Sequence, residues 1–204
     1  MRNAIVFDFD GTLIDTMDVK KKIYADAFIE EFGVDPDKRQ IITETQERLS
    51  GAPRFRQLAE TLKEFALTAT KEQVNSWNQR YQRYNDELTP LCNEFPLVRE
   101  MLEALSHSFD LYLASGLPTA DLKADAARRD LAKYFLDIRG GDKAQFCREL
   151  LQQGRKRMLF VGDGSYDRMA AQEADVPFVL VKGNEDLKRL MTKLTNDHFP
   201  PADL

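Results

Sequence analysis

Short apolar runs alternate with helix-like segments over most of the chain. Four runs rich in β-branched and aromatic residues predict buried strands, at residues 4–9, 109–114, 157–162 and 177–181. Apolar positions at helical spacing predict helices in the stretches around them, over residues 96–107, 118–129, 142–153, 165–174 and 184–195. Strands that alternate with helices are joined by right-handed crossovers and form parallel sheets with helices on both faces. The pattern therefore predicts an α/β fold with a Rossmann-like parallel sheet.

Residues 16–90 interrupt this alternation with helical patterns and no convincing strand. We expect this segment to be an all-helical insertion after the first strand, and residues 1–15 and 91–204 to form the sheet domain. Glycine and proline occur together at two expected breaks between its helices, Gly33 with Pro36 and Gly51 with Pro53.

The composition of the chain argues against a membrane protein and against a nucleic-acid-binding protein. The 204 residues are 43% hydrophobic and 31% charged, which is enough for one core and a modest insertion. The net charge of −5 offers no basic surface for nucleic acid or an anionic membrane, and no apolar run approaches the roughly 20 residues that span a bilayer. Cys92 and Cys147 lack metal-type spacing. The first residues are not a charged region followed by an apolar one, so we expect no secretion signal. We expect a cytoplasmic protein that binds neither nucleic acid nor membrane.

Polar residues stand where the predicted strands end. In a parallel sheet the carboxyl ends of the strands meet at one edge, where ligands bind. The residues expected at this edge are Asp8, Asp10, Ser115, Gly116, Asp163 and Asp167, together with Lys143 at the start of a preceding helix.

These residue types suit phosphoryl transfer. Crowded carboxylates repel unless a cation compensates them, and their oxygen atoms suit Mg²⁺ better than zinc. Asp8 could attack phosphorus as a nucleophile, and Asp10 could protonate the leaving oxygen and then activate water. Ser115, the backbone near Gly116 and Lys143 could hold the phosphoryl oxygens. Each feature, taken singly, is also typical of a turn, a helix start or a solvated strand end, and their joint order favours the site.

That order resembles the haloacid dehalogenase superfamily. The segment "DFDGT" (8–12) matches the first motif, D-x-D-G-T, and "GDGSYD" (162–167) matches the fourth, G-D-x-x-x-D. Ser115 and Lys143 match the second and third motifs. The helical insertion is similar to the cap of the phosphoglycolate-phosphatase-like and phosphomutase-like branch. The chain departs from the usual pattern in having Ser-Gly at the second motif and Gly-Ser-Tyr after the fourth-motif acid.

The resemblance implies a Mg²⁺-dependent phosphatase that forms an aspartyl-phosphate and acts on a small phosphorylated metabolite. It implies Asp8 as nucleophile and Asp10 as acid and base, and both as ligands of Mg²⁺, Asp10 through its backbone carbonyl. Asp163 would be a further ligand, and Asp167 a ligand or an acid behind it. The implied phosphate site consists of Ser115, Gly116 and Thr12, the last orienting the nucleophile's loop, with Lys143 balancing the charge.

Other activities compete with this hypothesis. Asp10 argues against a dehalogenase or a phosphonatase, because these lack the second acid. A phosphomutase has the same motifs and stays open. A receiver-like signalling module also gathers aspartates at a sheet edge, but the inserted segment and the D-x-D-G-T order speak against it. A catalytically inactive phosphate-binding protein is the remaining alternative, and retention of all the acids disfavours it.

Three arginines, Arg48, Arg54 and Arg56, flank the loop within "RLSGAPRFR" in the helical insertion. Guanidinium groups suit carboxylates and phosphates, so these are candidates for contact with an anionic leaving group. An exposed position on a helix is the alternative for each of them. The substrate and the choice between monomer and dimer stay open.

Overall fold

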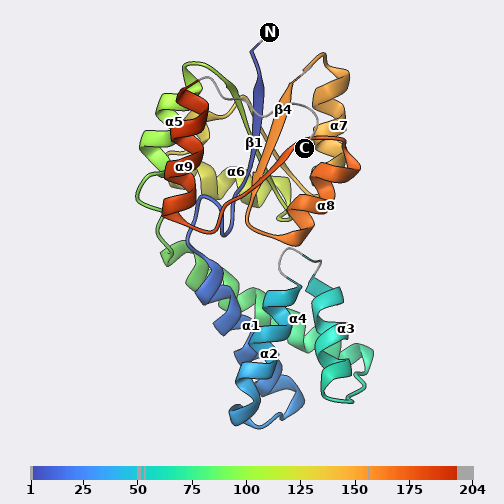
Figure 1. Ribbon diagram of the computed structural model, residues 1–204. Helices are drawn as coiled ribbons and strands as arrows, with labels where there is room; N and C mark the ends of the chain where they lie inside the picture. Colours follow the sequence, from blue (N-terminus) through green and yellow to red (C-terminus); the bar gives the residue numbers. More distant parts are fainter. Residues whose placement is uncertain (1, 50–51, 53, 156, 197–204) are drawn as a thin grey trace. The chain divides into compact units, whose positions relative to one another are not determined.

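The computed structural model describes residues 2–49, 52, 54–155 and 157–196 (Figure 1). The chain divides into two compact units. The core unit comprises Met1–Asp15 and Glu94–Leu204, and the helical unit comprises Thr16–Asn93. The helical unit includes the short turn of 3-10 helix Thr89–Leu91, which follows directly on its last α-helix.

The core unit contains a parallel sheet of five strands in the order β3-β2-β1-β4-β5. The strands are β1 Ala4–Asp8, β2 Asp110–Ser115, β3 Asp137–Gly140, β4 Met158–Gly162 and β5 Phe178–Leu180. The helices are α5 Val98–Ser106, α6 Thr119–Arg128, α7 Lys143–Gln152, α8 Ser165–Glu173 and α9 Asn184–Thr195. Figure 1 shows α5 and α9 on one side of the sheet and α7 and α8 on the other. The predicted α/β fold with a parallel sheet is confirmed.

The sequence pattern missed β3. Its sequence, Asp-Ile-Arg-Gly, buries one side chain, Ile138, and its other residues are half-buried. Arg139 forms ion pairs with Asp137 and with Glu149 of α7, at 3.3 and 3.2 Å. An edge strand has one free side and needs no continuous apolar run, so its sequence resembles a polar loop.

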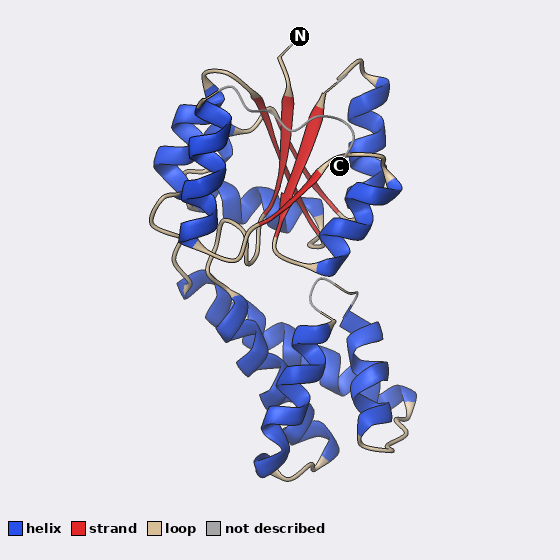
Figure 2. Cartoon of the chain, viewed as in Figure 1, coloured by secondary structure: helices blue, strands red, loops and turns tan. Residues whose placement is uncertain are grey.

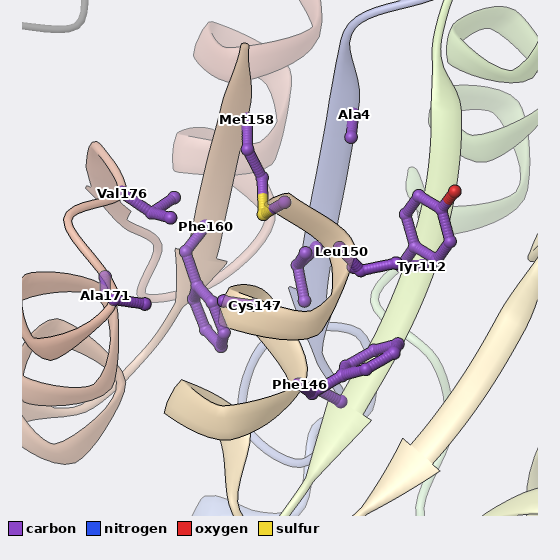
Figure 3. Packing of buried hydrophobic residues seen from close by; sticks show 12 residues of the cluster. Ala4, Tyr112, Phe146, Cys147, Leu150, Met158, Phe160, Ala171 and Val176 are labelled. Atoms are coloured by element: carbon purple, nitrogen blue, oxygen red, sulfur yellow. The ribbon is translucent and has the colours of Figure 1, made fainter. Parts of the chain in front are cut away.

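The sheet is covered on both faces, which explains why the central strands are apolar at nearly every position. Alternate residues of the strands point to the same face. Ala4 and Val6 of β1 and Phe160 of β4 belong to one buried cluster with Cys147 and Leu150 of α7 (Figure 3). This packing fixes the strand register and therefore the positions of the residues that follow the strands.

The helical unit is built from α1 Met17–Phe32, α2 Arg39–Arg48, α3 Arg54–Glu64 and α4 Lys71–Leu88 (Figure 2). As predicted, α1 ends at Gly33, which adopts φ of +62° and donates its N–H to the carbonyl of Ile29. Trp77 and Tyr24 pack edge to face in its core, with ring centroids 5.6 Å apart. The second predicted break, Gly51 with Pro53, lies outside the described residues. Across the described parts of both units, no helix has the length and apolarity to cross a membrane.

Candidate active site

The carboxyl ends of the central strands lie at one edge of the sheet. Asp8 is in register with Ala114, directly before Ser115, and Phe7 is in register with Val161. Ser115 in turn pairs with Gly140 of β3. The structure therefore brings the residues that end β1, β2 and β4 to the same level.

Lys143 connects two of the predicted acids. Its Nζ donates to Asp8 Oδ1 and to Asp167 Oδ1, each at 2.6 Å. Asp8 is 3% exposed and Asp167 is 1% exposed. Buried carboxylates are costly unless they are paired, and Lys143 supplies the nearby positive charge.

Burial and mutual repulsion shift the ionisation of this group. Burial raises the pKa of Asp8 well above its usual range, Lys143 opposes the shift, and the carboxylates of Asp167 and Asp163 add to it. Burial alone would lower the pKa of Lys143, but Asp8 and Asp167 outweigh it and raise the net value. Lys143 is therefore a permanent cation at neutral pH.

Three carboxylates form a group with the chemistry of a metal site. Asp8, Asp163 and Asp167 each offer an oxygen atom, and these atoms lie within 4.8 Å of one another. Hard oxygen donors without histidine or cysteine suit Mg²⁺. The residues present therefore fit the ion that the motifs imply. Among the described residues, the side chain of Asp10 is not part of this group of three.

The loop after β1 holds the first motif in a tight turn. Gly11 adopts φ of +83°, a conformation that favours glycine, and its N–H donates to the carbonyl of Ile14 at 2.8 Å. Asp10 forms a backbone bridge with the same residue. The buried hydroxyl of Thr12 donates to Asp8 Oδ2 at 3.3 Å, so it binds the carboxylate oxygen that Lys143 does not contact.

Ser115 and Lys143 each stand at a turn between elements. The Oγ of Ser115 accepts the N–H of Leu117 at 3.2 Å, and Gly116 between them is exposed. Asp142 caps α7 by accepting the N–H of Gln145 at 2.9 Å, so Lys143 is the first residue of that helix.

The fourth motif contains a supporting residue that the sequence reasoning did not assign. Asp167 Oδ2 accepts the N–H of Gly164 at 3.1 Å, while its Oδ1 faces Lys143. A Cβ atom on Gly162 would lie 2.5 Å from the Asp167 Cβ and 2.6 Å from its Cγ. Gly162 therefore makes room for the Asp167 side chain. The only sequence signal was a glycine ahead of the acid at a strand end.

The three predicted arginines lie in the helical unit and differ in their partners. Arg48 pairs with Glu64 at 2.7 Å, and Arg56 is exposed. Arg54 donates to Asn78 Oδ1 at 2.9 Å and to Gln82 Oε1 at 3.0 Å, and its guanidinium stacks 4.2 Å from the Tyr81 ring centroid. Arg54 thus donates hydrogen bonds to the neutral amides of Asn78 and Gln82, whereas Arg48 is paired with a carboxylate.

The chain is similar to known proteins along most of its length. A provisionally named pyrophosphatase, PpaX, from Caldanaerobacter subterraneus is 26% identical over 215 residues, covering 96% of this chain and 89% of the relative. A phosphoglycolate phosphatase from Synechococcus elongatus is 29% identical over 193 residues, covering 87% of this chain and 82% of the relative. These relatives match along most of their own length.

A solved structure shows the same fold. A haloacid dehalogenase-like family hydrolase from Streptococcus pneumoniae superposes with a TM-score of 0.70 at 24% identity, covering 92% of this chain and 90% of that one. The sequence profile of haloacid dehalogenase-like hydrolases matches residues 5–181, which is most of the chain. This protein belongs to the haloacid dehalogenase-like hydrolase family.

Proposed function

We propose that the protein is a Mg²⁺-dependent phosphatase of small phosphorylated metabolites that works through an aspartyl-phosphate on Asp8. The observation that carries the proposal is a pair of buried carboxylates, Asp8 and Asp167, each joined to the half-buried Lys143 by a 2.6 Å bond. Asp163 lies beside them. A buried carboxylate held at the end of a strand, next to a fixed cation, has the placement of a nucleophile for phosphorus. The family relationship and the names of the relatives support the same activity.

The proposed reaction has two displacements. A carboxylate oxygen of Asp8 forms a bond to phosphorus while the bond from phosphorus to the leaving oxygen breaks, and Asp10 gives that oxygen a proton. Asp10 then takes a proton from water, whose oxygen attacks phosphorus and releases inorganic phosphate from Asp8. Both carboxyl groups return to their starting states.

The other site residues hold the transferring group. Ser115 Oγ, the N–H of Gly116 and the Lys143 ammonium would contact phosphoryl oxygens, and Thr12 keeps Asp8 oriented. Asp8, Asp163 and Asp167, with the backbone carbonyl of Asp10, would hold Mg²⁺. When bound, the ion supplies positive charge that offsets the negative charge of the phosphoryl group.

We assign the helical unit the role of a cap and Arg54 the role of recognising the leaving group. We favour Arg54 over Arg48 because Arg48 already forms an ion pair with Glu64. The guanidinium of Arg54 is instead oriented by two neutral amides and an aromatic ring, those of Asn78, Gln82 and Tyr81. A guanidinium of this kind suits a carboxylate or a second phosphate. Phosphoglycolate and pyrophosphate, which the relatives' names indicate, each carry such a second anionic group.

Purified protein with Mg²⁺ should release phosphate from p-nitrophenyl phosphate, and from one or both of phosphoglycolate and pyrophosphate. Asp8→Asn should abolish this release, whereas Asp15→Asn, at an exposed carboxylate a few residues along the same segment, should retain it. Hydrolysis that survives Asp8→Asn, or that proceeds equally well in chelator, would contradict the mechanism. A sugar phosphate that isomerises without net phosphate release would instead identify a phosphomutase.

A further inference from the structure

Thr119, the first residue of α6, contacts Gly140, the last residue of β3. The N–H of Gly140 donates to Thr119 Oγ1 at 2.9 Å, and the same hydroxyl lies 3.3 Å from the Gly140 carbonyl oxygen, to which it donates. One hydroxyl thus serves both backbone groups of a single residue. Valine has the same shape as threonine but would leave both groups without this partner.

Gly140 also approaches the loop that follows Ser115 too closely for any side chain. A Cβ atom on Gly140 would overlap the carbonyl oxygen of Leu117 and lie 2.5 Å from the Thr119 nitrogen. All of these neighbours are backbone atoms, which cannot swing aside as a flexible side chain can. The absence of a side chain at Gly140 therefore lets β3 and the 116–119 loop lie in direct backbone contact.

This contact lies between two parts of the proposed phosphate site. On one side, Thr119 ends the loop that begins at Ser115, and Gly141 donates its N–H to the Ser115 carbonyl at 2.8 Å. On the other side, Gly140 is three residues before Lys143, whose Nζ contacts Asp8. A shift at the contact would move the Ser115 loop relative to the Lys143 ammonium.

We propose that Thr119 and Gly140 are positioning residues that hold the phosphoryl-binding loop and Lys143 in a fixed relation. The inference rests on the proposed function, because it assigns these residues a role in phosphoryl transfer. Donors from two loops must meet the same phosphoryl group at once, and a misplacement of about 1 Å can cost on the order of 100-fold in rate. Neither residue touches the reacting atoms, so they act through Ser115, Gly116 and Lys143.

The test compares Thr119→Val with Thr119→Ser in Mg²⁺-dependent hydrolysis of p-nitrophenyl phosphate. Since the loop can relax partly, we expect Thr119→Val to lower kcat about tenfold. It should also raise the inhibition constant of inorganic phosphate several-fold. A smaller folded fraction would lower kcat without changing that constant, so the constant separates positioning from stability. Thr119→Ser keeps the hydroxyl and should restore both values.

Thr192→Val is the matched control, because Thr192 also donates its hydroxyl to a backbone carbonyl within the core unit but lies at an exposed position of α9. It should leave both kinetic values unchanged. Gly140→Ala is the second variant and should reproduce the kinetic defect of Thr119→Val through steric overlap. Retention of wild-type kcat and phosphate inhibition in Thr119→Val would overturn the inference, as would equal defects in Thr119→Val and Thr119→Ser.

The two proposals fail in different ways. A wild-type protein that hydrolyses no phosphate ester overturns the proposed function, and with it the catalytic role of Thr119. Hydrogen exchange then still reports whether the hydroxyl ties the two segments together, because Thr119→Val should speed exchange at the Gly140 and Gly141 amides. An active wild-type protein with an unaffected Thr119→Val variant overturns the positioning role alone.

Discussion

Replacing Gly162 with alanine should damage the site by displacing Asp167. The added Cβ would lie 2.5 Å from Asp167 Cβ and 2.7 Å from Asp167 Oδ2. Carbon atoms in contact normally stand about 3.5 Å apart, so the Asp167 side chain or its backbone must move by about 1 Å. Both Asp167 and the strand around Gly162 are buried, which leaves little room for that movement.

The displacement breaks contacts whose loss can be given a magnitude. Asp167 accepts from Lys143 at 2.6 Å and from Gly164 at 3.1 Å, and a movement of about 1 Å takes either bond past the usual limit. A hydrogen bond to a charged group contributes about 1.5–3 kcal/mol, and overpacking a core costs about 1–3 kcal/mol. We therefore expect Gly162→Ala to lower the free energy of unfolding by about 3–5 kcal/mol, and kcat by about 100-fold if the phosphatase assignment holds.

Urea unfolding and steady-state hydrolysis measure the two effects. Gly116→Ala is the control for stability, since a Cβ on Gly116 would meet no atom within 4 Å. In a double-mutant cycle, Asp167→Gly should relieve the clash, so the two substitutions should couple by more than about 1 kcal/mol. Wild-type stability and activity in Gly162→Ala would refute the steric argument, and additive effects in the cycle would assign the damage to another cause.

Three further substitutions or reagents test the charges and the packing of the chain. Lys143→Met should abolish hydrolysis. Measured in the presence of chelator, it should also lower the free energy of unfolding by about 3–5 kcal/mol, because Asp8 and Asp167 stay buried without their cation. A urea transition equal to that of the wild type would contradict this. Arg54→Met should raise KM for substrates with a second anionic group much more than KM for p-nitrophenyl phosphate, and parallel changes would remove Arg54 from substrate recognition. Burial raises the pKa of the Cys147 thiol to about 12. In native protein at pH 8 this thiol should therefore not react with a disulfide reagent, and peptide mapping should find it labelled only after unfolding. The pKa of this thiol is higher in the folded protein than in the unfolded chain. The contribution of Cys147 to the free energy of unfolding should therefore be constant below about pH 9 and fall as the pH rises toward 12.

The acids of the site were predictable because the strands before them are unambiguous. The apolar runs that end at Asp8 and before Asp163 are covered on both faces, so their sequences leave no alternative to a buried strand. Once these strands are parallel, the acids at their ends must share an edge. The pattern of β3 is different, because an edge strand with a single buried residue, Ile138, has no periodic signal.

The supporting residues could not be predicted because their role depends on distant backbone. Gly162 needs its small size only because Asp167 turns back towards it, and Gly140 only because the 116–119 loop passes beside it. The distinction between Arg48 and Arg54 likewise depends on partners 16 to 28 residues away along the chain. The roles of these residues follow from contacts made in the folded chain, and the neighbouring sequence does not reveal those contacts.

The charges of the site explain why a divalent cation suits it. Asp8, Asp163 and Asp167 carry three negative charges when ionised, and Lys143 returns one positive charge, which leaves a net charge of −2. Burial, reinforced by the two neighbouring carboxylates, raises the pKa of Asp8 by more than Lys143 lowers it. Lys143 therefore contacts two of the acids without neutralising the group. The remaining charge equals that of one Mg²⁺ in magnitude, and oxygen ligands are the donors this ion prefers.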